Sequence, residues 1–211
     1  MKGARVFSAI VLLVLLASCS APMDTPMPLG LDGVALGASR SQTLAVRDNA
    51  RVNQSDRHVS EDVEILDGKF ALVTYFFESR WRLASVDIQF DVPELADEGL
   101  AAPLVLGAIL DQAVGIWGEP TQVNRLERRF EKIALMWAKD GYFVTLRMCP
   151  PEVIATAEHP QDPVGAYLSV SVPDVFEHRY ARSEFGVEYD QAAWEQVSQW
   201  LSSCRAAGVR L

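Results

Sequence analysis

Residues 69–92 constrain the fold more than any other part of this chain, because they predict two paired β-strands. The segment is rich in Val, Phe, Tyr, Trp and Ile, the residue types that favour strands. Polar residues 78–80 interrupt it and are expected to form the hairpin loop. In the second half the apolar positions shift by one residue near Ala84–Ser85, which predicts a β-bulge.

Helix signals stand on both sides of this hairpin. Ser39 followed by Gln42 has the spacing of a capping box, which predicts a short helix that ends near residues 48–49. Apolar residues at near-helical spacing predict a helix over 103–117. A last helix is predicted from Asp190, with one buried stripe formed by Trp194, Val197, Leu201 and Cys204.

Further strands are expected between the last two helices. The segments 121–130 and 132–138 each contain one, and the Asp140–Gly141 turn leads into a third. Alternation over 164–172 predicts the final strand. The segment 49–64 is polar and is expected to be a surface excursion.

A helix followed by a hairpin therefore occurs twice, which predicts the α+β class. We expect helix–hairpin units on an antiparallel sheet, with the C-terminal helix packed on the sheet. Residues 34–211 would form a single domain. The repetition leaves open whether this domain consists of two α-β-β halves, about 34–93 and 100–211.

The first 18 residues have the layout of a secretory signal. Lys2 and Arg5 precede an apolar stretch over residues 6–17. A helix of about 12 residues spans roughly 18 Å, which is short for a hydrocarbon core of about 30 Å. A positive start, a short apolar run and small residues are typical of an exported protein.

The end of this stretch, Leu16-Ala17-Ser18-Cys19, resembles the lipobox of bacterial lipoproteins. The resemblance implies that the signal is cut before Cys19, which then carries a diacylglycerol thioether and an acylated amino group. Two or more acyl chains anchor a protein stably. Ser20, in place of Asp, implies the periplasmic face of the outer membrane rather than the inner membrane.

Residues 19–33 are expected to be a tether between the lipid and the domain. Pro22, Pro26 and Pro28 are followed by Gly30 and Gly33, a composition typical of linkers. The first contact with the core would then lie beyond residue 33.

Composition excludes some classes of partner. Hydrophobic residues make up 49% of the chain, which indicates a globular protein, and the formal net charge is −9. Loss of Lys2 and Arg5 with the signal makes the mature chain more acidic still. An acidic body argues against nucleic acid and against broad adhesion to anionic lipids.

The other two cysteines are expected to form a disulfide. With Cys19 lipidated, Cys149 and Cys204 have a single possible pairing in an oxidising compartment. Cys149 ends a predicted strand and Cys204 lies on the buried stripe of the last helix. Two buried free thiols are the alternative.

No catalytic or metal-binding motif stands out. The chain has no G-x-S-x-G, no Gly-rich phosphate loop and no C-x-x-C. His58, His159 and His178 are scattered through polar segments without helical i, i+4 spacing. The sequence therefore indicates no catalytic residue, no metal site and no cofactor.

Aromatic residues supply the candidate face for a partner or ligand. Tyr75, Phe77, Trp81 and Trp137 are the residues singled out, with a core role as the alternative. Adjacent strand residues point to opposite faces, so Phe76 cannot share a side with Tyr75 and Phe77.

A second resemblance concerns residues 114–138. A helix, Gly-x-Pro, a strand and a Trp follow one another here, carried by Val114, Gly118, Pro120 and Trp137. This order is similar to that of small α+β lipoproteins that assist outer-membrane barrel assembly. The resemblance implies that the two groups of proteins have a similar arrangement of helix and strands.

Two functions follow as hypotheses. The first is a lipid-anchored, non-enzymatic envelope protein that binds or helps assemble a protein or cell-wall partner. The second is a membrane-tethered periplasmic hydrolase that uses carboxylates. A cleft with paired acidic residues would favour the second.

Overall fold

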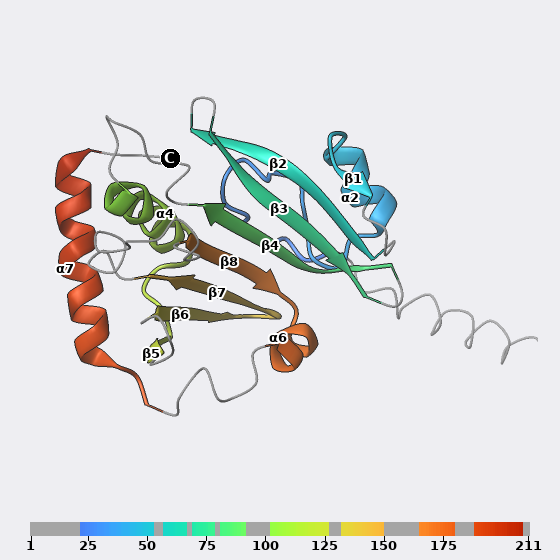
Figure 1. Cartoon of the computed structure of the whole chain (residues 1–211). Coiled ribbons are helices and arrows are strands. Elements are labelled where there is room, and N and C mark those ends of the chain that lie inside the picture. The colour runs from blue at the N-terminus through green and yellow to red at the C-terminus, as the bar shows by residue number, and fades with distance from the viewer. Residues whose placement is uncertain are drawn as a thin grey trace, which may run out of the picture.

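The computed structural model describes residues 22–52, 57–66, 69–78, 81–91, 102–126, 132–149, 165–179 and 188–208. It has an α+β fold built on one eight-stranded antiparallel sheet, as the sequence predicts (Figure 1). The helices are α2 (Arg40–Val46), α4 (Ala102–Trp117), α6 (Pro173–Arg179) and α7 (Gln191–Ala207). The strands are β1 (Arg51–Val52), β2 (His58–Leu66), β3 (Lys69–Phe77), β4 (Leu83–Asp91), β5 (Gln122–Leu126), β6 (Lys132–Lys139), β7 (Tyr142–Met148) and β8 (Gly165–Ser171).

The sheet consists of two meanders joined at their last strands. Its order is β1-β2-β3-β4-β8-β7-β6-β5, so β4 pairs with β8 at the centre. Each meander follows a helix, α2 in the first half and α4 in the second. One hydrophobic core cluster contains residues of both halves.

Several local predictions are confirmed. Ser39 caps α2 with both hydrogen bonds of the capping box, and Asp190 caps α7. The register between β3 and β4 shifts between Phe76 and Phe77, which places the bulge near Ala84–Ser85. Gly141, with φ of +86°, turns the chain between β6 and β7.

The prediction of a surface excursion over 49–64 is wrong for residues 58–64, and residues 53–56 lie outside the described residues. Residues 58–66 form β2, which pairs with β3 along its length. Every second residue of β2 faces the core, namely Val59, Glu61, Val63 and Ile65. The charged Glu61 at an inward position hides the strand pattern in the sequence.

The two faces of the sheet differ in chemistry. One face, called here the apolar face, carries buried aliphatic and aromatic residues that form the main core with α4, α7 and the N-terminal segment. The other face, called here the polar face, carries mainly hydroxyl, amide and charged groups in the central strands. The apolar face includes Val73, Tyr75, Val86, Ile88, Val144, Leu146, Leu168 and Val170.

The expectation of a tether over 19–33 is wrong for residues 22–33, which belong to the folded domain. Leu31 is fully buried and Leu29 nearly so, and both pack in the main core. The backbone N–H of Met23 donates to the carbonyl of Leu36 at 2.8 Å. Proline and glycine shape this segment, but its leucines give it apolar surface to bury.

Helix α7 packs against α4 and β5 (Figure 1). Trp194, Val197, Leu201 and Cys204 form its buried side, as predicted. Gly107 of α4 lies under Cys204, and a Cβ at Gly107 would be 2.6 Å from the Cβ of Cys204. The absence of a side chain at Gly107 therefore allows the two helices to approach closely at this point.

Among the described residues, no helix combines the length and apolar character needed to cross a membrane.

Candidate functional site

Three of the four predicted aromatic residues lie in the core and do not form a face for a partner. Tyr75, Phe77 and Trp137 are each fully buried on the apolar face. The indole Nε1 of Trp137 donates to the carbonyl of Gly118 at 2.7 Å. The prediction is wrong for these residues because alternation along β3 and β6 directs them toward α4 and the N-terminal segment.

Trp81 is the exception, because its side chain is 46% exposed. It lies between β3 and β4 and has a φ of +57°, which is unusual for a residue with a side chain. Trp81 precedes β4, whereas Leu83, the first residue of that strand, is buried.

Cys149 and Cys204 are both buried free thiols, so the expected disulfide is not present. Cys149 ends β7, whereas Cys204 rests on α4 with its Sγ 3.9 Å from the carbonyl of Pro103. Packing of α7 on α4 and β5 therefore directs Cys204 to α4. Burial raises the pKa of both thiols, which makes them poor nucleophiles. The lipidation residue Cys19 lies outside the described residues.

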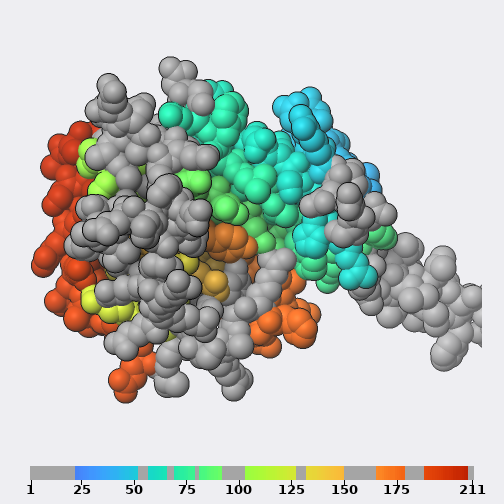
Figure 2. Space-filling view, in the orientation of Figure 1, coloured from blue at the N-terminus to red at the C-terminus, as the bar shows by residue number. Residues whose placement is uncertain are grey.

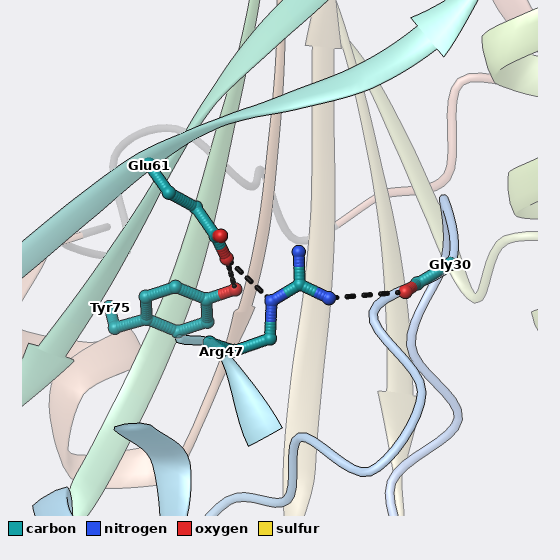
Figure 3. A network of polar contacts seen from close by, with 4 residues as sticks. All are labelled: Gly30, Arg47, Glu61 and Tyr75. Atoms are coloured by element: carbon teal, nitrogen blue, oxygen red, sulfur yellow. Dashed lines mark hydrogen bonds and ion pairs between the residues drawn. The ribbon is translucent and has the colours of Figure 1, made fainter. Parts of the chain in front are cut away.

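A buried polar network crosses the apolar face near α2 (Figure 3). One oxygen of Glu61 accepts hydrogen bonds from the Tyr75 hydroxyl at 2.5 Å and from Arg47 Nε at 2.6 Å. Arg47 Nη1 also donates to the carbonyl of Gly30 at 3.3 Å. The network thus ties β2 and β3 to the end of α2 and to the N-terminal segment.

Electrostatics favour this pairing. Burial raises the pKa of the Tyr75 hydroxyl far above its ordinary value, and the bond to Glu61 raises it further, so Tyr75 stays a neutral donor. Partial burial lowers the pKa of Arg47, but its interactions with Glu61 and Tyr75 together outweigh that effect, so the pKa is raised overall. Each buried group has its partner, so the network is structural in character.

The polar face carries a row of hydroxyl groups and one carboxylate across five adjacent strands. Strand pairing aligns Ser60 of β2, Thr74 of β3, Asp87 of β4, Ser169 of β8 and Thr145 of β7. We call these five residues the hydroxyl row. Ser169 Oγ donates to Asp87 Oδ1 at 2.7 Å, and the hydroxyls of Ser60 and Thr74 are 3.1 Å apart.

Not all of these groups have partners. The hydroxyl of Thr145 is buried without a hydrogen bond, and so are those of Ser85 and Ser171, which pair across β4 and β8 beside the row. A buried polar group without a partner costs about 1 to 3 kcal/mol. All three hydroxyls are almost fully buried, so they reduce the stability of the fold and are not part of the exposed surface.

Exposed apolar residues border the hydroxyl row. Phe70 and Leu72 of β3 are 52% and 42% exposed and lie two residues apart on the polar face. Figure 2 shows the side chains of β2 and β3 at the surface in this orientation. Tyr167 of β8 and Phe143 of β7 are further aromatic residues on the polar face. Phe143 stacks on Phe176 of α6, with the ring centroids 4.3 Å apart.

No named motif marks the polar face in the sequence, so the face was not predicted. The signal was present in β4, where Ser85, Asp87 and Gln89 alternate with apolar residues, and in β8, where Ser169 and Ser171 do so. Strand order is needed to bring these residues together, and one sequence does not give it.

Metal-binding chemistry is not indicated within the part of the chain that is described. No group of three His, Cys, Asp or Glu residues there has the geometry to hold an ion. The His58 ring lies 5.0 Å from that of Phe76, and His178 is exposed on α6. His159 lies outside the described residues.

Comparisons with known proteins give little. No family model matches the chain. No curated protein matches it either. A crystal structure of a DUF4309 family protein (YjgB) from Bacillus subtilis matches with a TM-score of 0.36 and 10% identity, covering 74% of this chain and 91% of that one. At this TM-score the likeness supports no inference about fold or function.

Proposed function

We propose that the mature protein is a lipoprotein anchored by Cys19, at the periplasmic face of the outer membrane, and that its domain binds an envelope protein or cell-wall component without catalysing a reaction. The order of charge, apolar run, small residues and Cys19 supports the anchor. The domain that follows the signal would then bind the envelope partner.

The observation that carries the binding role is the polar face. The exposed Phe70 and Leu72 of β3 lie between the exposed Asp62 and Glu64 of β2 and the exposed Gln89 of β4. The amide of Gln89 can donate and accept and the carboxylates can accept, so these groups suit peptide amides or sugar hydroxyls, and the apolar pair adds buried area. A polypeptide or glycan of the envelope therefore suits this face.

Metabolic labelling with a fatty acid tests the anchor. Wild-type protein should incorporate the label, and Cys19→Ala should not, because the thioether and the acylated amine both require that residue. Label that persists in Cys19→Ala would contradict the anchor. Ser20→Asp should shift part of the protein to the inner membrane on fractionation.

Crosslinked pull-down of the native, lipidated protein tests the binding role. A defined envelope component should copurify with wild type and should be lost when Leu72→Asp alters the polar face. Leu72 is exposed, so this change should leave the fold intact. Gln199→Asp, at an exposed position of α7, is the matched control. Recovery of the lone protein from crosslinked cells would contradict the proposal.

A carboxylate-dependent hydrolase remains the second candidate, because Asp87 and Ser169 are hydrogen-bonded on the polar face. In that case purified protein should turn over cell-wall fragments, and Asp87→Asn should abolish turnover while binding persists. No turnover by wild-type protein would exclude this role for the fragments tested.

A further inference from the structure

The N-terminal segment limits how far the domain can stand from its anchor. Among the described residues, Met23 is the first with a backbone hydrogen bond to the domain, donating to Leu36. Three residues lie between Cys19 and Met23, so four residue steps of at most about 3.5 Å span no more than about 14 Å. A domain lipidated at Cys19 therefore stays close to the bilayer.

Hydrogen bonds connect this entry point to the β3–β4 hairpin. Gly37, next to Leu36, donates its N–H to the carbonyl of Leu83 at 2.8 Å, and Leu83 donates back to Ala38 at 2.8 Å. The N–H of Arg40 then donates to the carbonyl of Trp81 at 3.0 Å. The β3–β4 connection, which contains Trp81, is thus tied to the N-terminal segment, and this end of β3 and β4 lies away from α7 (Figure 1).

Trp81 is held outward at this end. Its backbone has a φ of +57°, fixed on one side by its N–H bond to Glu78 at 2.9 Å and on the other by Arg40. Such a conformation costs free energy for a residue with a side chain, and it keeps a large aromatic ring 46% exposed. The Arg40 guanidinium carbon lies 5.9 Å from the ring centroid.

Positive charge accompanies the exposed ring. Arg82 donates from Nη1 to the carbonyl of Gly37 at 2.8 Å. Within the described ranges, neither Arg40 nor Arg82 forms an ion pair with a carboxylate. The acidic groups at this end include Glu78 in the hairpin, Asp140 in the β6–β7 turn and Asp174 at the start of α6. A side chain at Gly141, next to Asp140, would meet Met23.

We propose that this end of the domain rests on the lipid surface, with Trp81 at the headgroup level and Arg40 and Arg82 facing lipid phosphates. Tryptophan favours the membrane–water interface, and guanidinium groups bind phosphate. The inference rests on the proposed lipidation of Cys19, which fixes the partner as the bilayer that holds the anchor. The polar face then extends away from the anchor along the strands.

Quenching of tryptophan emission by brominated lipid tests this orientation. Lipidated protein is reconstituted in vesicles of phosphatidylethanolamine and phosphatidylglycerol with brominated acyl chains. Bromine-dependent quenching is expected for wild type and should be lost in Trp81→Ala. Trp200→Phe, on the distant helix α7, is the matched control and should retain it.

A second variant keeps Trp81 and removes the charges. Arg40→Gln combined with Arg82→Gln should reduce quenching and the blue shift of the emission. Mass spectrometry of the same sample establishes whether Cys19 is lipidated. If it is lipidated and Trp81→Ala quenches like wild type, the orientation is overturned and the anchor stands. If it is not lipidated, both are overturned.

Discussion

The two faces of the sheet bury polar groups in different ways. On the apolar face the charged Glu61 is buried, but Tyr75 and Arg47 satisfy it. On the polar face the hydroxyls of Ser85 and Ser171 are buried with no hydrogen bond. The first arrangement stabilises the fold, whereas in the second the free-energy cost of burying the hydroxyls is not offset by hydrogen bonds.

The difference shows that the role of a buried polar residue depends on its partners. Glu61, a charged residue at an inward position, is satisfied by Tyr75 and Arg47. Four members of the hydroxyl row are hydrogen-bonded to one another, whereas Thr145 and the neighbouring Ser85 and Ser171 are buried without a hydrogen bond. The proposed binding surface is the exposed part of the polar face, at Phe70, Leu72 and Gln89.

The largest effect is expected from Glu61→Ala. Removal of the carboxylate leaves Arg47 and the Tyr75 hydroxyl without their shared acceptor, which costs about 3 to 5 kcal/mol of unfolding free energy. Urea unfolding measures it. Asp62→Ala, at an exposed position of the same strand, is the control and should change stability little. Equal losses in the two variants would contradict a structural role for the network.

The next largest loss of stability is expected from Gly107→Ala, at the point where α7 packs closely on α4. The added methyl would overlap Cys204, so we expect a loss of about 1 to 3 kcal/mol. Gly115→Ala, in the same helix with open space around it, should instead stabilise by roughly 0.5 to 1 kcal/mol. Thermal unfolding of both variants checks this. Stabilisation by both would show that the helices are farther apart.

Alkaline pH probes the apolar face through Tyr75. Burial raises the pKa of Tyr75, so its contribution to stability is complete below about pH 10, where unfolded tyrosine ionises, and is lost as pH rises above it. Each unit above about pH 10 then costs up to about 1.4 kcal/mol. Unfolding curves at rising pH should fall less steeply for Tyr75→Phe. Parallel curves would contradict burial of a neutral Tyr75.

The smallest change in stability is expected on the polar face. Ser85→Ala and Ser171→Ala each remove a hydroxyl that makes no hydrogen bond, so stability should stay constant or rise by up to about 1 kcal/mol. Urea unfolding is again the measurement. A loss above about 1 kcal/mol would show that these hydroxyls stabilise the fold, and the contrast between the faces would fail.

Much of the fold could be predicted because local chemistry determines it. The capping box at Ser39, the bulge near Ala84–Ser85 and the helix after Asp190 each depend on residues close in sequence. Long-range features were missed for physical reasons. The central place of β8 depends on pairing with β4, and β2 was hidden because the acid at Glu61 interrupts its apolar alternation.

The candidate site was the least predictable part. Aromatic content suggested Tyr75, Phe77 and Trp137, but side-chain alternation sends these residues to the apolar face. Leu29 and Leu31 were assigned to a tether because of nearby proline and glycine, although they pack in the core. Residue type alone does not show which face of a sheet a strand position occupies.

Site-specific photocrosslinking in cells tests the binding role of the polar face most directly. A photoreactive side chain at Gln89, exposed on the polar face in β4, should crosslink to an envelope component. The same group at Gln199, exposed on α7, should not. A shifted band at position 89 alone is the predicted result. Crosslinks at position 199 and none at 89 would contradict the assignment of the polar face as the binding surface.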